Sequence, residues 1–143
     1  MNSEPRTAAY AAFLLRIALG LMFLSHSVVL KYFTFTLGGT AKFFASIGLW
    51  SPLAYVVFAA EVIGGVLLIL GVQVRLVALA LLPILLGAVW VHAGNGCVFT
   101  SPNGGWEYPL YLSLLTIVQV LLGEGAYALA PSKPLPVLSA LSA

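Results

Sequence analysis

Charged residues are scarce in this chain of 143 residues. Only 7% of the residues are charged, whereas 62% are hydrophobic and the mean hydropathy is +1.08. An ordinary soluble domain carries about 25% charged residues. So few charges cannot cover the outside of a globule, and the apolar excess must face something other than water. We therefore expect a lipid bilayer around the protein.

Aspartate is absent, and cysteine occurs only once. The charges are six Lys or Arg and four Glu, and they give a formal net charge of +2. That charge is too weak and too scattered for a nucleic-acid surface, so nucleic acid is not an expected partner. The single Cys97 excludes an intrachain disulfide and a Cys-x-x-Cys pair, and we interpret its thiol as incidental.

Four long apolar runs predict the fold. A helix needs roughly 20 apolar residues to cross the ~30 Å hydrocarbon core of a bilayer. Runs of about that length, bounded by turn-forming residues, cover residues 8–30, 53–71, 74–92 and 108–129. We expect an all-α integral membrane protein with four transmembrane helices in an up-down bundle. No repeat or composition break divides the chain, so residues 1–143 are expected to form a single membrane domain.

The first run contains a charge, Arg16. An arginine at the centre of a span costs about 2.5–3.5 kcal/mol, and each surrounding Leu, Ile, Phe or Val returns roughly 0.3–0.6 kcal/mol. The apolar residues of this run offset that cost. A cleaved signal peptide is the alternative, but Arg16 divides the stretch, and the sequence Leu24-Ser25-His26 does not resemble a cleavage site. We interpret the run as a span.

The segments between the runs differ in character. Phe43, Phe44 and Ile47 fall at helical spacing beside Lys42, which predicts a short interfacial helix between the first two spans. Residues 93–107 are rich in Gly, Asn and Pro and predict a long loop. With four spans, both termini lie on one side, and that side has a slight excess of Lys and Arg. This excess favours a cytoplasmic (inner) membrane protein with both termini in the cytoplasm.

Ionisable residues inside a bilayer are costly and usually face the interior of the bundle. At 1.5 Å per residue, Arg16 lies about 12 Å from the inner end of its helix, and Glu61 lies about 12 Å from the outer end of the second. Roughly 6 Å then separates them along the membrane normal, which predicts an ion pair. His26 and His92 share a depth of about 27 Å from the inner boundary.

Further polar and aromatic residues fall near the level of the two histidines. They are Lys31, Trp106, Glu107 and Tyr108. We predict His26, His92, Glu61 and Arg16 as catalytic residues, and these four as substrate-binding residues. A purely structural interpretation stays open for each: the buried pair would fix helix register, the histidines would sit in a wet interface or cap a helix, and the aromatic residues would anchor the interface.

These residues resemble a known family. The chain is similar to the DoxX family of small four-helix membrane proteins over about residues 12–128, although Ser27 stands where the family commonly has glycine. The resemblance rests on Leu15-Arg16-x-x-x-Gly20, His26, Lys31, Glu61-x-x-Gly64-Gly65, Gly71, Arg75, His92, Trp106-Glu107-Tyr108-Pro109 and Gly123-x-Gly125. By analogy it implies a link to the membrane subunit of thiosulfate:quinone oxidoreductase and to oxidative-stress and thiol functions.

The leading functional hypothesis is a component of a membrane redox system that binds a quinone or a small oxidisable substrate in an outward-facing polar pocket. In it, His26 and His92 donate protons, Glu61 or Glu107 relays them, and Arg16 keeps Glu61 ionised. No residue of the chain carries electrons by itself, so a soluble or membrane redox partner protein is expected. The substrate, the electron donor and a homo-oligomeric state all stay open, as does catalysis by the chain itself.

Two alternatives use the same residues differently. His26 and His92, at equal depth on two helices, could ligate a haem, or could bind a metal together with Glu61 or Glu107. The chain could instead be a non-enzymatic membrane scaffold or chaperone that recruits partners. In that case the polar residues would serve the fold alone.

Overall fold

The computed structural model describes residues 4–133, and this part of the chain is helical with turns between the helices. Apart from a single isolated bridge between Val72 and Ala130, the described residues contain no β-structure. The expected all-α class is therefore confirmed. The elements are α1 (Glu4–Leu24), the π-helix η1 (Ser25–Thr34), α2 (Leu37–Ser46), α3 (Leu53–Leu70), α4 (Val74–His92) and α5 (Glu107–Leu122).

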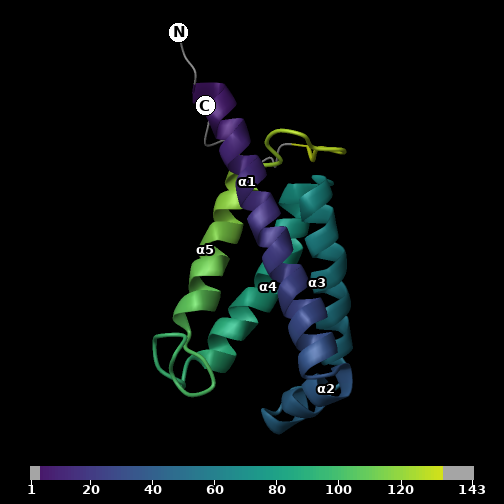
Figure 1. Ribbon diagram of the computed structural model, residues 1–143, viewed down its shortest axis with the longest axis vertical. Coiled ribbons are helices and arrows are strands. Elements are labelled where there is room, and N and C mark those ends of the chain that lie inside the picture. Colours follow the sequence, from purple (N-terminus) through teal and green to yellow (C-terminus); the bar gives the residue numbers. More distant parts are fainter. Residues whose placement is uncertain (1–3, 134–143) are drawn as a thin grey trace.

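The four long helices α1, α3, α4 and α5 run alternately up and down (Figure 1). α1 packs against α3, and α4 packs against α5. The two pairs lie close together where the turn 71–73 joins α3 to α4, and they diverge toward the opposite end of the molecule. We call that opposite end, which carries η1, α2 and the loop 93–106, the loop end, and the other the terminal end.

Within residues 4–133, three helical segments are long and apolar enough to cross a membrane. They are Arg6–Thr34, which joins α1 to η1, and the helices Leu53–Leu70 and Val74–His92. α5 has 16 residues and extends about 24 Å, which is short of a ~30 Å core. The fourth span was predicted to continue to residue 129, and this is wrong. Gly123 takes a φ of 81° at the end of α5 and ends the helix.

The first span also differs from its prediction. The helix continues through η1 to Thr34, four residues beyond the predicted end at residue 30. The short helix expected after it is present as α2, which starts at Leu37 behind the side-chain cap of Thr36. Its placement in a membrane interface stays a prediction. Residues 93–106 form the expected loop of turns.

Glycines bring the helices into close contact. A Cβ atom on Gly20 of α1 would lie 2.8 Å from the carbonyl oxygen of Gly65 on α3, so the two backbones touch there. A Cβ atom on Gly64 would lie 2.7 Å from Leu81 of α4. Small residues allow this approach in a lipid environment. Beside these crossings lies a core of buried apolar residues: Leu19, Phe23, Leu68, Val74, Val77, Leu81, Leu85 and Leu112.

Candidate functional site

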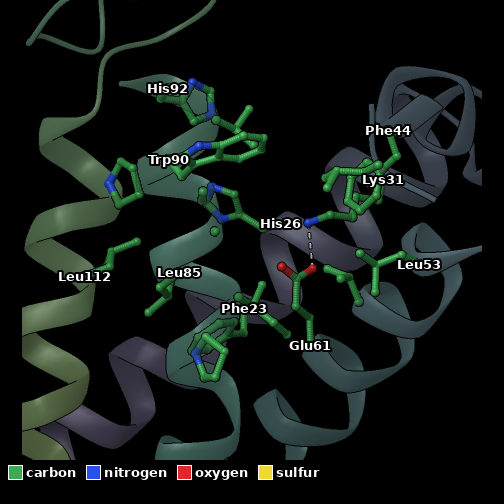
Figure 2. A pocket seen from close by; sticks show the side chains of 18 of the residues that line it. Phe23, His26, Lys31, Phe44, Leu53, Glu61, Leu85, Trp90, His92 and Leu112 are labelled. Carbon is green, nitrogen blue, oxygen red and sulfur yellow. Dashed lines mark hydrogen bonds and ion pairs between the residues drawn. The ribbon is translucent and has the colours of Figure 1, made fainter. Parts of the chain in front are cut away.

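A cavity of about 490 Å³ lies at the loop end, between the two diverging helix pairs. Figure 2 shows His26 and the Lys31–Glu61 pair in the middle of this pocket, with Trp90 and His92 on one side and Phe44 and Leu53 on the other. Its lining comes from α1, η1, α2, α3, α4 and α5, with Leu49 in the turn after α2. Most of the lining is apolar. The polar side chains in it are those of His26, Lys31, Glu61, His92 and Tyr108.

The π-helix η1 gives the pocket two of these side chains. A π-helix closes hydrogen bonds between residues five apart, such as the one from the N–H of Phe35 to the carbonyl of Leu30, 2.8 Å long. Residues five apart therefore lie near one face of η1. His26 and Lys31 are five apart and both line the pocket. In an α-helix the same spacing would turn them about 140° away from each other.

An ion pair joins η1 to α3 in the wall of the pocket. The Nζ atom of Lys31 lies 2.7 Å from Oε2 of Glu61, and the two side chains are 18% and 6% exposed. Lys31 was predicted as a substrate-binding residue and Glu61 as the partner of Arg16. The structure brings Lys31 and Glu61 together instead. The prediction missed this pair because it ended the first helix before Lys31.

The predicted ion pair between Arg16 and Glu61 is wrong. Arg16 is fully buried near the terminal end and does not line the pocket. Its guanidinium donates hydrogen bonds of 2.7–3.2 Å to carbonyl oxygens at the end of α3 and in the segment after α5. Those oxygens belong to Leu68, Ile69, Ala126 and Tyr127. Arg16 therefore acts at the opposite end of the bundle from Glu61.

His26 is held in a defined orientation at the pocket. Its Nδ1 atom lies 3.0 Å from the carbonyl oxygen of Met22, and its ring stacks on Tyr108 with 6.0 Å between ring centroids. A carbonyl oxygen can only accept a hydrogen bond, so Nδ1 carries a proton. In the neutral ring the other nitrogen, Nε2, is then a hydrogen-bond acceptor.

His92 reaches the same pocket from the end of α4. Its Nδ1 atom lies 3.1 Å from the carbonyl oxygen of Gly104, and the side chain of Asn95 lies close to the same nitrogen. Asn95 also donates to the carbonyl of Asn103. These contacts tie the loop 93–106 to α4. The two histidines predicted to share a depth do line one cavity.

The remaining predicted residues lie beside the pocket. Glu107 and Tyr108 line a second cavity of about 600 Å³ together with Phe99 and Tyr111, and only Tyr108 lines both cavities. Oε1 of Glu107 accepts a hydrogen bond from the N–H of Phe99. Trp106 precedes α5 and lines neither of these cavities.

Sequence reasoning missed Phe43, Phe44 and Leu49 as lining residues of the first cavity. The aromatic pair lies on α2, which was predicted only as an interfacial helix. Nothing in its spacing indicated that α2 would fold back onto α3 and η1. Within the described residues, no group of three or more His, Cys, Asp or Glu could hold a metal ion.

Comparison with known proteins identifies the family of the chain. The family model of DoxX matches residues 11–94, which is more than half of the chain. The chain belongs to the DoxX family. Together with the long apolar helices, this membership makes it a multi-pass membrane protein. The match covers α1 from residue 11 onward and all of η1, α2, α3 and α4, and therefore every residue that lines the pocket except those of α5.

Two relatives extend the comparison beyond the matched domain. A Bacillus subtilis (strain 168) protein named "Putative oxidoreductase CatD" is 37% identical over 118 residues, which cover 82% of this chain and 83% of that protein. An "Uncharacterized protein" of Haemophilus influenzae is 31% identical over 131 residues, which cover 90% of this chain and 95% of that protein. No solved structure matches the chain.

Proposed function

We propose that this DoxX protein is a component of a membrane redox system and binds a quinone in the pocket at the loop end. The observation that carries the proposal is the placement of His26 and the Lys31–Glu61 pair inside an apolar cavity. The name of the Bacillus subtilis relative supports the same class of chemistry.

The size and lining of the pocket suit a small ring with polar substituents. Small-molecule sites in proteins have volumes of about 300–1,000 Å³, are mostly apolar and contain a few polar groups. The cavity of about 490 Å³ falls within this range. Its aromatic and aliphatic walls would contact the faces of a quinone ring, and the few polar side chains would contact the ring oxygens.

The polar side chains can supply protons at defined atoms. A bound quinone would accept electrons and protons at its two carbonyl oxygens. Lys31 has three N–H donors and uses one on Glu61, so two are left to donate to a ligand oxygen. His26 and His92 each have an Nε2 atom free of the backbone contact, and the carboxylate of Glu61 stabilises Lys31 in its charged, proton-bearing form.

The electrons must come from outside this chain. A redox-active dithiol needs two cysteines, and the sequence has only Cys97, which is exposed in the loop 93–106. We therefore expect a redox partner protein, soluble or membrane-bound, at the loop end. The small oxidisable substrate considered from the sequence would take the place of that partner.

An equilibrium titration tests the proposal. The purified full chain in detergent is titrated calorimetrically with a quinone that carries no long tail. The key variant combines Lys31→Met with Glu61→Leu. Replacing both members of a buried ion pair with apolar residues is often neutral for stability, whereas removing one partner is not. Lys42→Met, which removes an exposed lysine outside the pocket, is the matched control.

We expect saturable binding to the wild type, binding at least about tenfold weaker in the double variant, and no change in Lys42→Met. Absence of binding to a folded wild type would overturn the proposal and favour the scaffold hypothesis. Equal binding in the double variant would place the site elsewhere. A haem absorption band in the purified protein would instead favour ligation by His26 and His92.

A further inference from the structure

Five residues that line the pocket are also exposed, and they mark where it opens. Four of them are Phe43 on α2 and Pro83, Gly87 and Trp90 on α4; the fifth is Tyr108, which also borders the second cavity. Phe43 and Trp90 are 48% and 62% exposed. Positions 83, 87 and 90 are four and three residues apart and so lie on one face of α4. The pocket therefore opens between α2 and α4, toward the outside of the helix bundle. We call Phe43, Pro83, Gly87 and Trp90 the side opening.

The side opening lies within the length of a helix that can cross the membrane. α4 ends at His92. At 1.5 Å per residue, Gly87 lies about 7.5 Å and Pro83 about 13.5 Å from that end along the helix. A position at that depth faces lipid chains, and a molecule that passes through it must be soluble in them.

Gly87 keeps this opening wide. A Cβ atom on Gly87 would have no other atom within 4 Å, whereas the Cβ positions of Gly20 and Gly64 are crowded. Glycine in the interior of a helix is less favourable than alanine. Neither helix stability nor packing against the described residues therefore requires glycine at position 87. The missing side chain leaves free space at the mouth of the pocket.

The volume of the pocket limits what part of a ligand it can enclose. About 490 Å³ is the size of a small-molecule site, so it holds a ring and its substituents but not the whole of a ligand whose hydrocarbon tail is much longer than the ring. The charged groups, Lys31 and Glu61, lie inside the pocket, and the side opening is apolar. We infer that the ligand is a lipid-soluble quinone that enters from the bilayer, with its head in the pocket and its apolar tail in the side opening at Gly87. This inference rests on the proposed function.

Two quinones with the same ring allow the binding of the head and of the tail to be measured separately. One carries only a methyl group, and the other carries a decyl chain at that position. The wild type and Gly87→Phe are titrated with both in nanodiscs. Leu86→Phe is the matched control, because Leu86 is the next residue on α4, is 50% exposed and does not line the pocket. Thermal unfolding of both variants checks that they fold, which the free space at Gly87 leads us to expect.

We expect Gly87→Phe to weaken binding of the decyl quinone by about tenfold or more, with binding of the methyl quinone within about twofold of the wild type. Leu86→Phe should change neither. If both quinones bind Gly87→Phe as they bind the wild type, or if both weaken equally, the side opening is not the place of the tail, although the proposed function stands. If neither quinone binds the wild type, the proposed function and this inference are both overturned.

Discussion

Arg16 holds two parts of the chain together at the terminal end. It is completely buried, and its guanidinium donates to two carbonyls of α3 and to two in the segment after α5. The α3 carbonyls lie at the end of the helix, where such groups have no partner within the helix. A single side chain therefore satisfies backbone carbonyls of two separate segments.

Arg16→Met should destabilise the fold without changing the pocket. Hydrogen bonds to charged groups are worth about 1.5–3 kcal/mol each, and Arg16→Met removes the four that the guanidinium donates. We expect the free energy of unfolding in detergent to fall by about 2–4 kcal/mol. Quinone affinity, measured below the unfolding transition, should stay that of the wild type. Loss of affinity with unchanged stability would contradict the structural role of Arg16.

The hydrogen-bonded carboxyl of Glu124 makes the stability of the fold depend on pH. Burial of its carboxyl acts to raise the pKa, but the hydrogen bonds from the hydroxyl and N–H of Ser132 and from its own backbone, together with the charge of Arg75, outweigh it, and the pKa lies below its usual value of 4.5. A lowered pKa in the folded state stabilises the protein at pH values above the usual pKa. That contribution disappears as the pH falls through the folded-state pKa.

We therefore expect the thermal unfolding midpoint to fall between pH 6 and pH 3, and to fall less in Glu124→Gln. Far-UV circular dichroism in detergent measures both. Glu107→Gln is the control, because Glu107 lies at the opposite end of α5. An identical pH dependence in wild type and Glu124→Gln would contradict this account of the carboxyl.

At the scale of single residues, the sequence predicted which side chains matter better than it predicted their partners. The cost of charge in a membrane singles out Arg16, Glu61, His26 and His92 whatever their contacts. Three of these four line one pocket. Pairing was inferred from depth alone, and depth cannot show which face of a helix a residue occupies. The partner predicted for Arg16 was therefore wrong.

At the scale of secondary-structure elements, the packing of the bundle depends on how closely its helices cross. α1 and α3 approach so closely that a Cβ atom on Gly20 would meet the backbone of Gly65. Backbone atoms cannot move aside as the end of a flexible side chain can. The helices would have to separate along their whole contact.

Gly20→Ala should therefore destabilise the protein although alanine is the better helix former. We expect a loss of about 1–2 kcal/mol in the free energy of unfolding, since overpacking costs about 1–3 kcal/mol and helix propensity returns part of it. Gly38→Ala in α2 is the control, because its Cβ position has nothing within 4 Å. Stabilisation by Gly20→Ala would contradict the close crossing.

The π-helix η1 could not be predicted from the sequence. Apolar periodicity identifies a helical run, but the run from residue 8 to 30 carries no signal that separates α from π winding. The winding decides whether His26 and Lys31 share a face. The ion pair with Glu61 and the central part of the pocket therefore depend on a feature that only the structure reveals. π-helical turns are often found at functional sites.

At the scale of the whole molecule, composition and run length were sufficient for the class of fold. Four apolar runs predicted the up-down order of α1, α3, α4 and α5, and their starting points are close to those observed for α3, α4 and α5. The end of the last run was wrong because an apolar composition continues past Gly123, where the backbone turns. Residues 123–130 lie against the terminal ends of α1 and α3 instead, as the hydrogen bonds from Ala126 to Ala9 and from Leu129 to Leu70 show.

Orientation in the membrane can be tested with the single cysteine. The loop 93–106 is expected on the outer side because the termini are expected in the cytoplasm. Cys97 is exposed in that loop. A membrane-impermeant maleimide should therefore label Cys97 in cells whose inner membrane is intact, once any outer membrane or cell wall has been made permeable to the reagent. Gln73→Cys in a Cys97→Ser background should be labelled only after the inner membrane is permeabilised, and the reverse pattern would contradict the orientation.

Photolabelling locates a quinone bound in the pocket at the loop end. The full chain in nanodiscs is irradiated with a quinone that carries an azide on its ring, and the labelled residues are mapped by mass spectrometry. Unmodified quinone serves as the competitor. We expect competed labels on the pocket segments 22–31, 83–92 and 108–112. Competed labels confined to the terminal end, or labels that the competitor does not reduce, would contradict it.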